Sequence, residues 1–450
     1  MSNATSSSAV VRIRDGASLI FNLPEYDVID AVDLPTGGRR VVVQAVDRDD
    51  ACPDCGVIST RVHQWTRQRV ADLPAGGAQV EVVVRKPRML CAEPACDRRT
   101  FVQVTDQLPL RARCLTRLRN ELVDAVINSG RAIDEVATSY GVAWWTVQAA
   151  INTAAVTLPD PDTVPVRHLG IDEHRFARAR FFRDEASGSW RRVEPWMSTF
   201  VNAETGQVLG IVDGRARAGI QAWLEARSDT WRERVEVVAI DPSAPFRSAI
   251  TQALPGAKVS VDHWHLVRLA NLALTKVRQR VAREQLGHRG RKDDLAWAHR
   301  MLLLRAGDRL SVRAQHRLEH VLRVDDPTDE IGAAWAVKER LRLLLACTDL
   351  DAADHARGML GLAVLGADMD ETWRLWETVN AWWDEIETFI VTRVTNARTE
   401  AANTSIKQIK RTGRGYRNPA HYQGRILLRS ARRTRRRRTL IQQATTLNCG

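Results

Sequence analysis

Four of the seven cysteines in this 450-residue sequence have a spacing suited to metal binding. Cys52 and Cys55 form one pair, Cys91 and Cys96 form a second, and thirty-five residues separate the pairs. Zn²⁺ takes four thiolates in a tetrahedron at about 2.3 Å, and tight turns present such ligands in pairs. Gly56 directly after the first pair lets the backbone turn back toward the metal. The cysteines therefore predict a zinc site.

Two alternatives remain for this cluster. The second pair has four residues between its cysteines instead of the usual two, so His63 is a possible replacement ligand. The four thiols could also be buried together without a metal. Arginines outnumber acids around the second pair, which makes this module a candidate surface for phosphate contacts.

Three carboxylates suggest a second kind of metal chemistry. Asp172 ends the apolar run RHLGID, Asp241 ends the run VEVVAID, and Glu400 lies in the helical segment TNARTEAAN. Acids at the ends of neighbouring strands in an α/β sheet can share a divalent cation. Phosphoryl transfer with two Mg²⁺ ions needs such a set of carboxylates. Any one of these acids, taken alone, could instead simply cap a helix.

The elements that must position these acids follow from the hydrophobic pattern. Short apolar runs alternate with helical stretches after a linker at residues 158–165, which is typical of an α/β domain. The pattern predicts strands at 166–172, 196–202, 208–212, 235–241 and 257–262, and helices at 218–227 and 245–254. From residue 263 to about 391 the pattern is helical throughout, with no strand signal.

A helical pattern also covers residues 131–151, which have the form of a helix-turn-helix. Gly141 would supply the turn. The second helix would then expose Trp144, Thr146 and Gln148 toward a DNA major groove. A helical hairpin that contacts no DNA is the alternative.

The net charge of +12 is concentrated in one place. Residues 401–450 hold 13 Lys and Arg and no acid, which leaves 53 basic against 54 acidic residues in the first 400. Such a block favours a polyanionic partner, first nucleic acid and only second an anionic membrane surface. Lys407, Lys410, Arg411 and Arg414 follow Glu400 closely and are expected to neutralise phosphates. No long apolar run or secretory signal is present, so we expect a cytoplasmic, nucleoid-associated protein.

The order of these motifs resembles that of bacterial insertion-sequence transposases of the DDE type, specifically the ISL-three group. The motifs are the cysteine pairs, the helix-turn-helix, GIDEH, the strand ending in Asp241, the tetrad from Asp262 to His265, and TNARTEAANTSIKQIKR. The resemblance spans roughly residues 39–433. It implies that Asp172, Asp241 and Glu400 bind Mg²⁺ (or Mn²⁺), while Asp262 and His265 support them. The sequence departs from the family at Pro242-Ser243 and Ala401, but keeps every ligand.

The resemblance also implies the fold class: an α/β, RNase H-like catalytic domain with a large all-helical insertion, preceded by a zinc ribbon and a helix-turn-helix. The expected boundaries are an N-terminal arm, partly strand (1–50), zinc ribbon (51–110), helix-turn-helix (111–157), catalytic core (166–265), helical insertion (266–391), last core helix (392–430) and basic tail (431–450).

The expected function is that of a transposase that binds the inverted repeats of its element, cleaves the DNA and joins the ends to a target. Double-stranded DNA would be the partner, with no membrane, and two ends would require at least a homodimer. Two other functions remain: a DNA-binding regulator with an inactive catalytic domain, and an RNase H-like nuclease without strand transfer.

Overall fold

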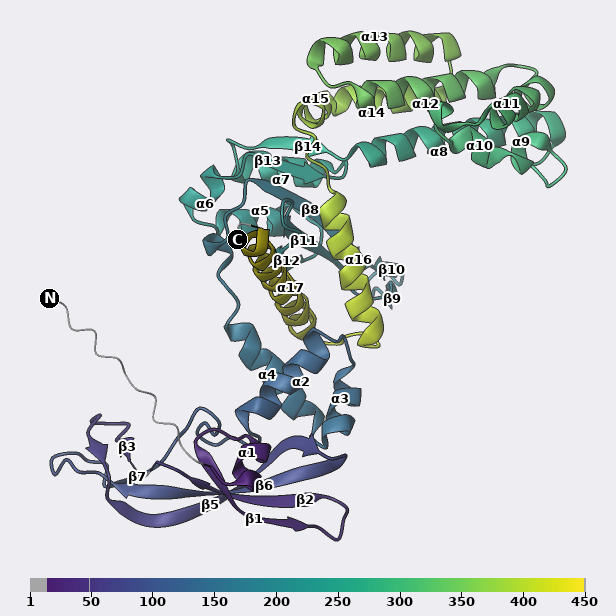
Figure 1. The fold of residues 1–450 in the computed structure, drawn as a ribbon. Helices are drawn as coiled ribbons and strands as arrows, with labels where there is room; N and C mark the ends of the chain where they lie inside the picture. The colour runs from purple at the N-terminus through teal and green to yellow at the C-terminus, as the bar shows by residue number, and fades with distance from the viewer. Residues whose placement is uncertain (1–13, 48, 449–450) are drawn as a thin grey trace. The chain divides into compact units, whose positions relative to one another are not determined.

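The structure is a computed structural model that describes residues 14–47 and 49–448 and divides into two compact units (Figure 1). The first comprises Met1–Thr157 with Arg411–Arg414, and the second comprises Leu158–Lys410 with Gly415–Gly450. The chain passes from one to the other at Leu158, where the Pro- and Asp-rich linker segment begins.

Among the described residues, the first unit contains four helices, the short β3–β4 pair and a five-stranded sheet. Its strands run in the order β1-β2-β6-β5, with β7 paired to β6. Its elements are α1 Gly16–Phe21, β1 Tyr26–Asp33, β2 Arg39–Ala45, β3 Asp50–Ala51, β4 Ile58–Ser59, β5 Val62–Ala75, β6 Ala78–Leu90, β7 Thr100–Val102, α2 Thr116–Ile127, α3 Ile133–Tyr140 and α4 Trp144–Val156. Val43, Val82 and Val84 on its central strands are fully buried in the core of this sheet.

The segment expected to be an N-terminal arm is part of this sheet. The strand content expected for this arm is present: β2 pairs in parallel with β6 from Arg39 to Gln44. β1, which pairs with β2, is mostly exposed along its length. Residues 1–13 of the expected arm lie outside the described part of the chain.

The second unit contains a five-stranded mixed sheet in the order β12-β11-β8-β13-β14. β11 pairs antiparallel with both β12 and β8, whereas β13 pairs in parallel with both β8 and β14. Its elements up to the sheet's last strand are the 3-10 turn Pro161–Thr163, β8 His168–Arg175, β9 Arg180–Arg183, β10 Trp190–Val193, β11 Trp196–Asn202, β12 Val208–Asp213, α5 Arg217–Glu225, α6 Asp229–Glu233, β13 Val237–Ile240, α7 Ala244–Ala253 and β14 Lys258–Val261. All five predicted strands are present; the β9–β10 hairpin was not predicted.

Helices cover both faces of this sheet. Successive side chains of a strand point to opposite faces, so each face presents apolar side chains to the helices beside it. On one face, Leu169 and Ile171 of β8 pack with residues of α5 and α7. On the other face, Met197 and Val201 of β11 pack with residues of α16 (Ala397–Thr412) and α17 (Pro419–Asn448) (Figure 1). Gly170 and Asp172 therefore point toward α16.

The stretch after β14 is helical as predicted, as far as residue 392. It contains α8 His263–Leu286, α9 Leu295–Ala298, α10 Arg300–Leu304, the 3-10 turn Gly307–Arg309, α11 Val312–Asp325, α12 Glu330–Ala346, α13 Leu350–Ala367, α14 Asp370–Ala381 and α15 Trp383–Thr392. Buried Leu341, Leu360 and Val379 from three of these helices belong to one hydrophobic cluster that continues into the sheet.

The C-terminal region differs from the expected single core helix followed by a basic tail. Two helices are present, and α17 continues without a break through the arginine-rich block to Asn448. An arginine has high helix propensity, so a run of arginines extends a helix already anchored by buried Tyr422 and Ile426. Among the described residues, no helix combines the length and apolar composition needed to cross a bilayer.

Candidate active site and metal-binding clusters

Three aspartates lie side by side at one edge of the mixed sheet. The parallel pairing places Ile171, Ile240 and Val261 in register on β8, β13 and β14. The next residues are Asp172, Asp241 and Asp262, so the three aspartates occupy adjacent positions along this edge. Asp172 does not end its strand as predicted, because β8 continues to Arg175 in its antiparallel pairing with β11. It lies where the parallel pairing to β13 stops.

The start of α16 supplies two amides to these acids. Asn396 donates from Nδ2 to Asp241 Oδ1 at 3.2 Å, and Asn403 donates to Asp172 Oδ2 at 2.6 Å. Glu400 lies four residues after Asn396 and three before Asn403, which places all three on one face of the helix. Glu400 is exposed and its backbone N–H bonds to Asn396 O at 3.0 Å. The third acid is thus on the helix face that carries the amides contacting the other two.

Asp262 and His265 complete the group. His265 Nε2 lies 3.0 Å from Asp241 Oδ2, and Asp262 accepts from the Trp264 backbone N–H at 2.8 Å, which caps α8. Ligand atoms of Asp241, Asp262 and His265 all lie within 4.8 Å of one another. The helix cap holds Asp262 in place, and the start of α8 carries His265 to Asp241.

Burial and neighbouring carboxylates together disfavour the charged forms of Asp172 and Asp241. Burial, followed by the charge of Asp172, raises the pKa of Asp241 to about 7. Burial also raises the pKa of Asp172, although hydrogen bonds from the Glu173 backbone and Asn403 oppose it. Several adjacent carboxylates are a donor set suited to a hard divalent cation, which favours the ionised forms.

Buried oxygens around the acids are also consistent with the binding of a divalent cation. Among the residues described, Asn396 Oδ1, Thr399 Oγ1 and Asn403 Oδ1 are buried without a hydrogen-bond partner. Unpaired buried polar atoms are rare and require an explanation such as an absent ion or water. The residues present therefore fit a divalent cation.

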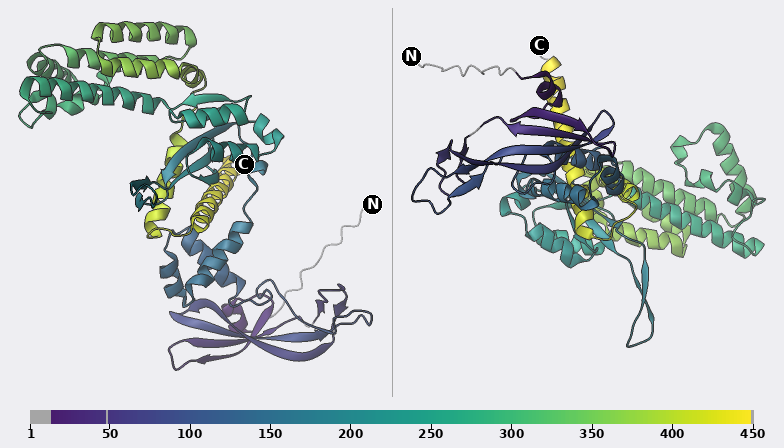
Figure 2. Two further views of the ribbon diagram at one scale, coloured as in Figure 1. Left: turned by 180° about the vertical axis from the view of Figure 1, so that it is seen from behind. Right: turned by 90° about the horizontal axis from the view of Figure 1, so that it is seen from below.

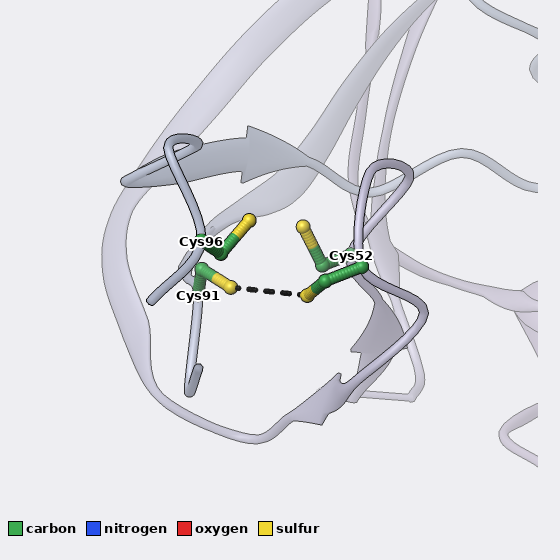
Figure 3. A group of neighbouring side chains, drawn as sticks. Cys52, Cys91 and Cys96 are labelled. Carbon is green, nitrogen blue, oxygen red and sulfur yellow. Dashed lines mark hydrogen bonds between the residues drawn. The ribbon is translucent and has the colours of Figure 1, made fainter. Parts of the chain in front are cut away.

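The four cysteines of the first unit meet as predicted. The sulfur atoms of Cys52, Cys55, Cys91 and Cys96 lie within 4.8 Å of one another, and the sulfurs of Cys55 and Cys91 are 3.5 Å apart. Figure 3 shows Cys91 and Cys96 facing Cys52 across a common centre. His63 is exposed and does not belong to the cluster.

Local backbone geometry forms the first cysteine turn. Gly56 adopts a φ of +74°, and its N–H bonds to Cys52 O at 2.8 Å. Although burial opposes it, hydrogen bonds from the backbone of Cys55 and Asp54 lower the pKa of Cys52 to about 7. The turn thus favours the thiolate, which is the form that binds Zn²⁺.

Comparison with known proteins gives a family match for each of the two segments that contain these clusters. Residues 169–426 match a family of ISL3-type proteins described as a transposase. Residues 48–96 match the zinc-finger of transposase IS204/IS1001/IS1096/IS1165. The chain belongs to the ISL3 family of insertion-sequence transposases. A relative, the transposase for insertion sequence element IS1001 of Bordetella parapertussis, is 26% identical over 300 residues, which are 63% of this chain and 67% of that protein.

The basic residues predicted beside the acids of this ISL3-family chain fall into two groups. Lys407 is on the Glu400 face of α16, and its charge lowers the pKa of Asp172. Lys410 donates from Nζ to Arg175 O at 3.0 Å. Arg411 and Arg414 are grouped with the first unit, where Arg414 makes an exposed ion pair with Glu135. Of these four residues, only Lys407 and Lys410 therefore belong to the unit that holds the acids.

The predicted DNA-facing residues of α4 are only partly exposed. α2, α3 and α4 pack against one another, and Gly141 ends α3 with a φ of +62°. Trp144 is exposed and Thr146 is half-buried, but Gln148 is 2% exposed and donates to Asn152 Oδ1 at 2.7 Å. The prediction for Gln148 was wrong, because α4 packs on both α2 and α3 and so buries a wider face than one apolar stripe.

Sequence reasoning missed the residues that hold the acids in place. Asn396 and Asn403 flank Glu400 at helical spacing in TNARTEAAN, a signal that was available but was not assigned a role. Gly170 was also missed. A Cβ there would overlap the Thr399 hydroxyl and lie 3.1 Å from Asn396 Oδ1, so the close approach of α16 to β8 requires glycine.

Proposed function

We propose that this ISL3-family protein is a Mg²⁺-dependent DDE transposase that binds the terminal inverted repeats of its element, cleaves the DNA there and transfers the ends to a target. The observation that carries the proposal is the row of Asp172 and Asp241 beneath a helix face bearing Glu400. We further propose that the mixed sheet with α16 is an RNase H-like domain, interrupted by the helical insertion before Glu400.

Asp172, Asp241 and Glu400 would hold two Mg²⁺ or Mn²⁺ ions. Bound there, these ions would supply Lewis acidity for both the attacking and the leaving oxygen of a phosphodiester. In cleavage, a water oxygen bonds to phosphorus and the bond from phosphorus to the 3′ oxygen breaks. The 3′ oxygen leaves as a hydroxyl, with the proton given up by the water. That hydroxyl then attacks a phosphodiester of the target in the same site: its oxygen bonds to phosphorus, the target's bond from phosphorus to its 3′ oxygen breaks, and this 3′ oxygen leaves as a hydroxyl with the proton given up by the attacking hydroxyl.

The surrounding residues orient these carboxylates. Asn396 and Asn403 fix the Asp241 and Asp172 carboxylates by hydrogen bonds, and His265 contacts Asp241 from the start of α8. Lys407 adds positive charge beside Asp172. Residues that orient metal ligands in this way commonly change metal affinity or activity by about 10- to 100-fold when removed.

The first unit would recognise the element ends. We assign zinc to the four cysteines and propose that α3 and α4 act as a helix-turn-helix, with Trp144 and Thr146 facing DNA. Lys407, Lys410, Arg411 and Arg414 would contact phosphates. Because two ends must be held together, the reaction would require at least a homodimer.

The test is cleavage and joining of DNA that carries the flanks of the gene, by wild type, Asp241→Asn and Glu400→Gln. We expect Mg²⁺-dependent nicks and joined products with wild type, and a loss of about 10³-fold or more in both variants, because each removes a ligand charge worth several kcal/mol. Asp229→Asn, an exposed acid on α6, is the control and should cleave normally.

Each other function predicts a different result. Equal and negligible cleavage by wild type and variants, with intact binding, would indicate a regulator with an inactive catalytic domain. Nicking without joined products would indicate a nuclease without strand transfer. Either result would overturn the proposal.

A further inference from the structure

The hairpin of β9 and β10 is almost entirely exposed to solvent. All residues of β9 are exposed, and so are three of the four in β10. Phe181, Phe182 and Trp190 are 62%, 52% and 69% exposed, and no hydrophobic cluster of the described residues includes them. Figure 2 shows this hairpin projecting from the sheet that carries the aspartates. An isolated two-stranded hairpin is marginally stable in water, so exposed rings on it indicate a surface that binds something.

Both faces of the hairpin carry the same chemistry. Cross-strand partners point to the same side, and Phe181 pairs with Arg192 while Phe182 pairs with Arg191. Trp190 opposite Arg183 shares the Phe181 face, whereas Arg180 shares the Phe182 face. Each face thus presents aromatic rings beside guanidinium groups.

The charge of the hairpin identifies its partner. Five arginines and two acids lie between residues 178 and 192. Of the two acids, Asp184 accepts hydrogen bonds from the Ser187 backbone and hydroxyl at 2.8 Å and so serves the turn. Arg180 and Arg191 make no ion pair with any residue in the described part of the chain. Free guanidinium groups between exposed rings match phosphates and bases, whereas a second copy of a chain of net charge +12 is a poor electrostatic match.

The hairpin is joined through short connections to β8 and β11 of the proposed active site. Its two strands continue β8 and β11, where Arg175 pairs with Trp196. The guanidinium groups of Arg175 and Arg215 lie over the Trp196 ring, 5.0 and 4.8 Å from its centroid. Trp196 Nε1 donates to Glu194 Oε2 at 3.1 Å. Phe181 is nine residues after Asp172, so it lies at most about 30 Å from that carboxylate. DNA held at the aspartates therefore passes within reach of the hairpin.

We infer that the β9–β10 hairpin enters a groove of the DNA beside the cleavage site, with arginines on phosphates and Phe181, Phe182 and Trp190 against unstacked bases. The inference rests on the proposed function, since it takes the scissile DNA to lie at the aspartates. Two-stranded β-ribbons fit DNA grooves, and apolar wedges between base steps distort the duplex. The hairpin would thereby hold the DNA in the distorted form presented to the carboxylates.

The test uses the full chain and a duplex of the gene's flank, without added divalent cation, so that binding is separated from cleavage. Fluorescence anisotropy gives affinity across a range of salt concentrations, and 2-aminopurine placed near the cut site reports unstacking. The variants are F181A/F182A/W190A and R180A/R191A. The control R313A/R317A removes two exposed arginines from α11 of the helical insertion.

We expect the aromatic variant to lose the 2-aminopurine signal and to bind at least tenfold more weakly. R180A/R191A should reduce the slope of log affinity against log salt by about two, because two phosphate contacts are lost. The control should bind as wild type does. Unchanged thermal unfolding would show that the variants fold.

Several results would overturn the inference. One is that both hairpin variants bind DNA with the affinity of wild type. Another is that the control R313A/R317A loses as much DNA affinity as the hairpin variants do. A third is that the hairpin variants no longer dimerise but still bind DNA. Wild type that binds no DNA would refute both this inference and the proposed function. Wild type that binds but never cleaves would refute the proposed function alone, because the anisotropy still decides the role of the hairpin.

Discussion

The cysteine cluster and the aspartate cluster are positioned in two different ways. Each pair of cysteines sits in its own turn, and only Cys52, Met89 and Phe101 form the buried core beside them. The aspartates instead lie at the ends of the parallel pairing of three strands, and Asp241 and Asp172 are oriented by the amides of Asn396 and Asn403, 155 and 231 residues away in the chain. We therefore expect the first cluster to depend on a bound metal for stability, and the second to depend on the packing of a large domain. Four predictions test this difference between the two clusters.

The largest effect should follow the loss of a cysteine ligand. We expect wild type to hold about one zinc per chain and Cys52→Ser to hold none. Structural zinc contributes roughly 10 kcal/mol or more to folding of small modules, and three buried residues cannot replace it. Metal analysis and thermal unfolding of the purified protein measure this. Cys347→Ser, outside the cluster, is the control. Retained zinc in Cys52→Ser would refute the assignment.

The aspartate cluster should destabilise the protein when no divalent cation is bound. Because the folded state raises the pKa of Asp241 from 3.8 to about 7, the contribution of this group to stability is present at low pH and is lost as the pH rises from about 4 to 7. Asp241→Asn should therefore be more stable than wild type by up to about 4 kcal/mol at pH 8, and by less than about 1 kcal/mol near pH 4.

Urea unfolding without divalent cations measures this difference, and Mg²⁺ should stabilise wild type only. Neighbouring Asp172 and Asp262 also raise the pKa of Asp241, so their own asparagine variants should show the same trend with a smaller amplitude. A variant less stable than wild type at pH 8 would contradict the prediction.

The contact between β8 and α16 should be sensitive to a single methyl group. Gly170→Ala places a Cβ against Thr399 and Asn396, which must shift α16 away from the acids. We expect a loss of about 1–3 kcal/mol in stability and a fall of tenfold or more in cleavage. Gly256→Ala is a matched control, since nothing lies within 4 Å of its added Cβ. Equal behaviour of the two variants would show that α16 does not pack closely at Gly170.

The smallest effect should follow removal of one orienting amide. Asn403→Ala should lower cleavage by about 10- to 100-fold and raise the Mg²⁺ concentration needed for half-maximal rate, because the Asp172 carboxylate loses its donor. A Mg²⁺ titration separates this from a general loss of stability, which would leave that concentration unchanged. Thr404→Ala, at the next and exposed position, should cleave as wild type does.

The cysteine pairs, the five strands and the helical stretch could be predicted from the sequence because each depends on residues close together in the chain. Turn residues fix the cysteine geometry, and apolar periodicity fixes the strands. The same reasoning found Asp172 and Asp241, since parallel strands bring their ends to one edge, whereas Asp262 and His265 were expected only from the resemblance to the transposase family.

Only the tertiary structure decided which side chains hold these groups in place. The contacts of Asn396 and Asn403 with the acids, the need for Gly170, the burial of Gln148 and the membership of residues 26–45 in the first sheet all depend on segments far apart in sequence. No local pattern encodes them, because the partner that buries or bonds a residue is chosen by the packing of whole elements. The exposed β9–β10 hairpin is the converse case: its short strands have no buried face, so no alternation marks them in the sequence.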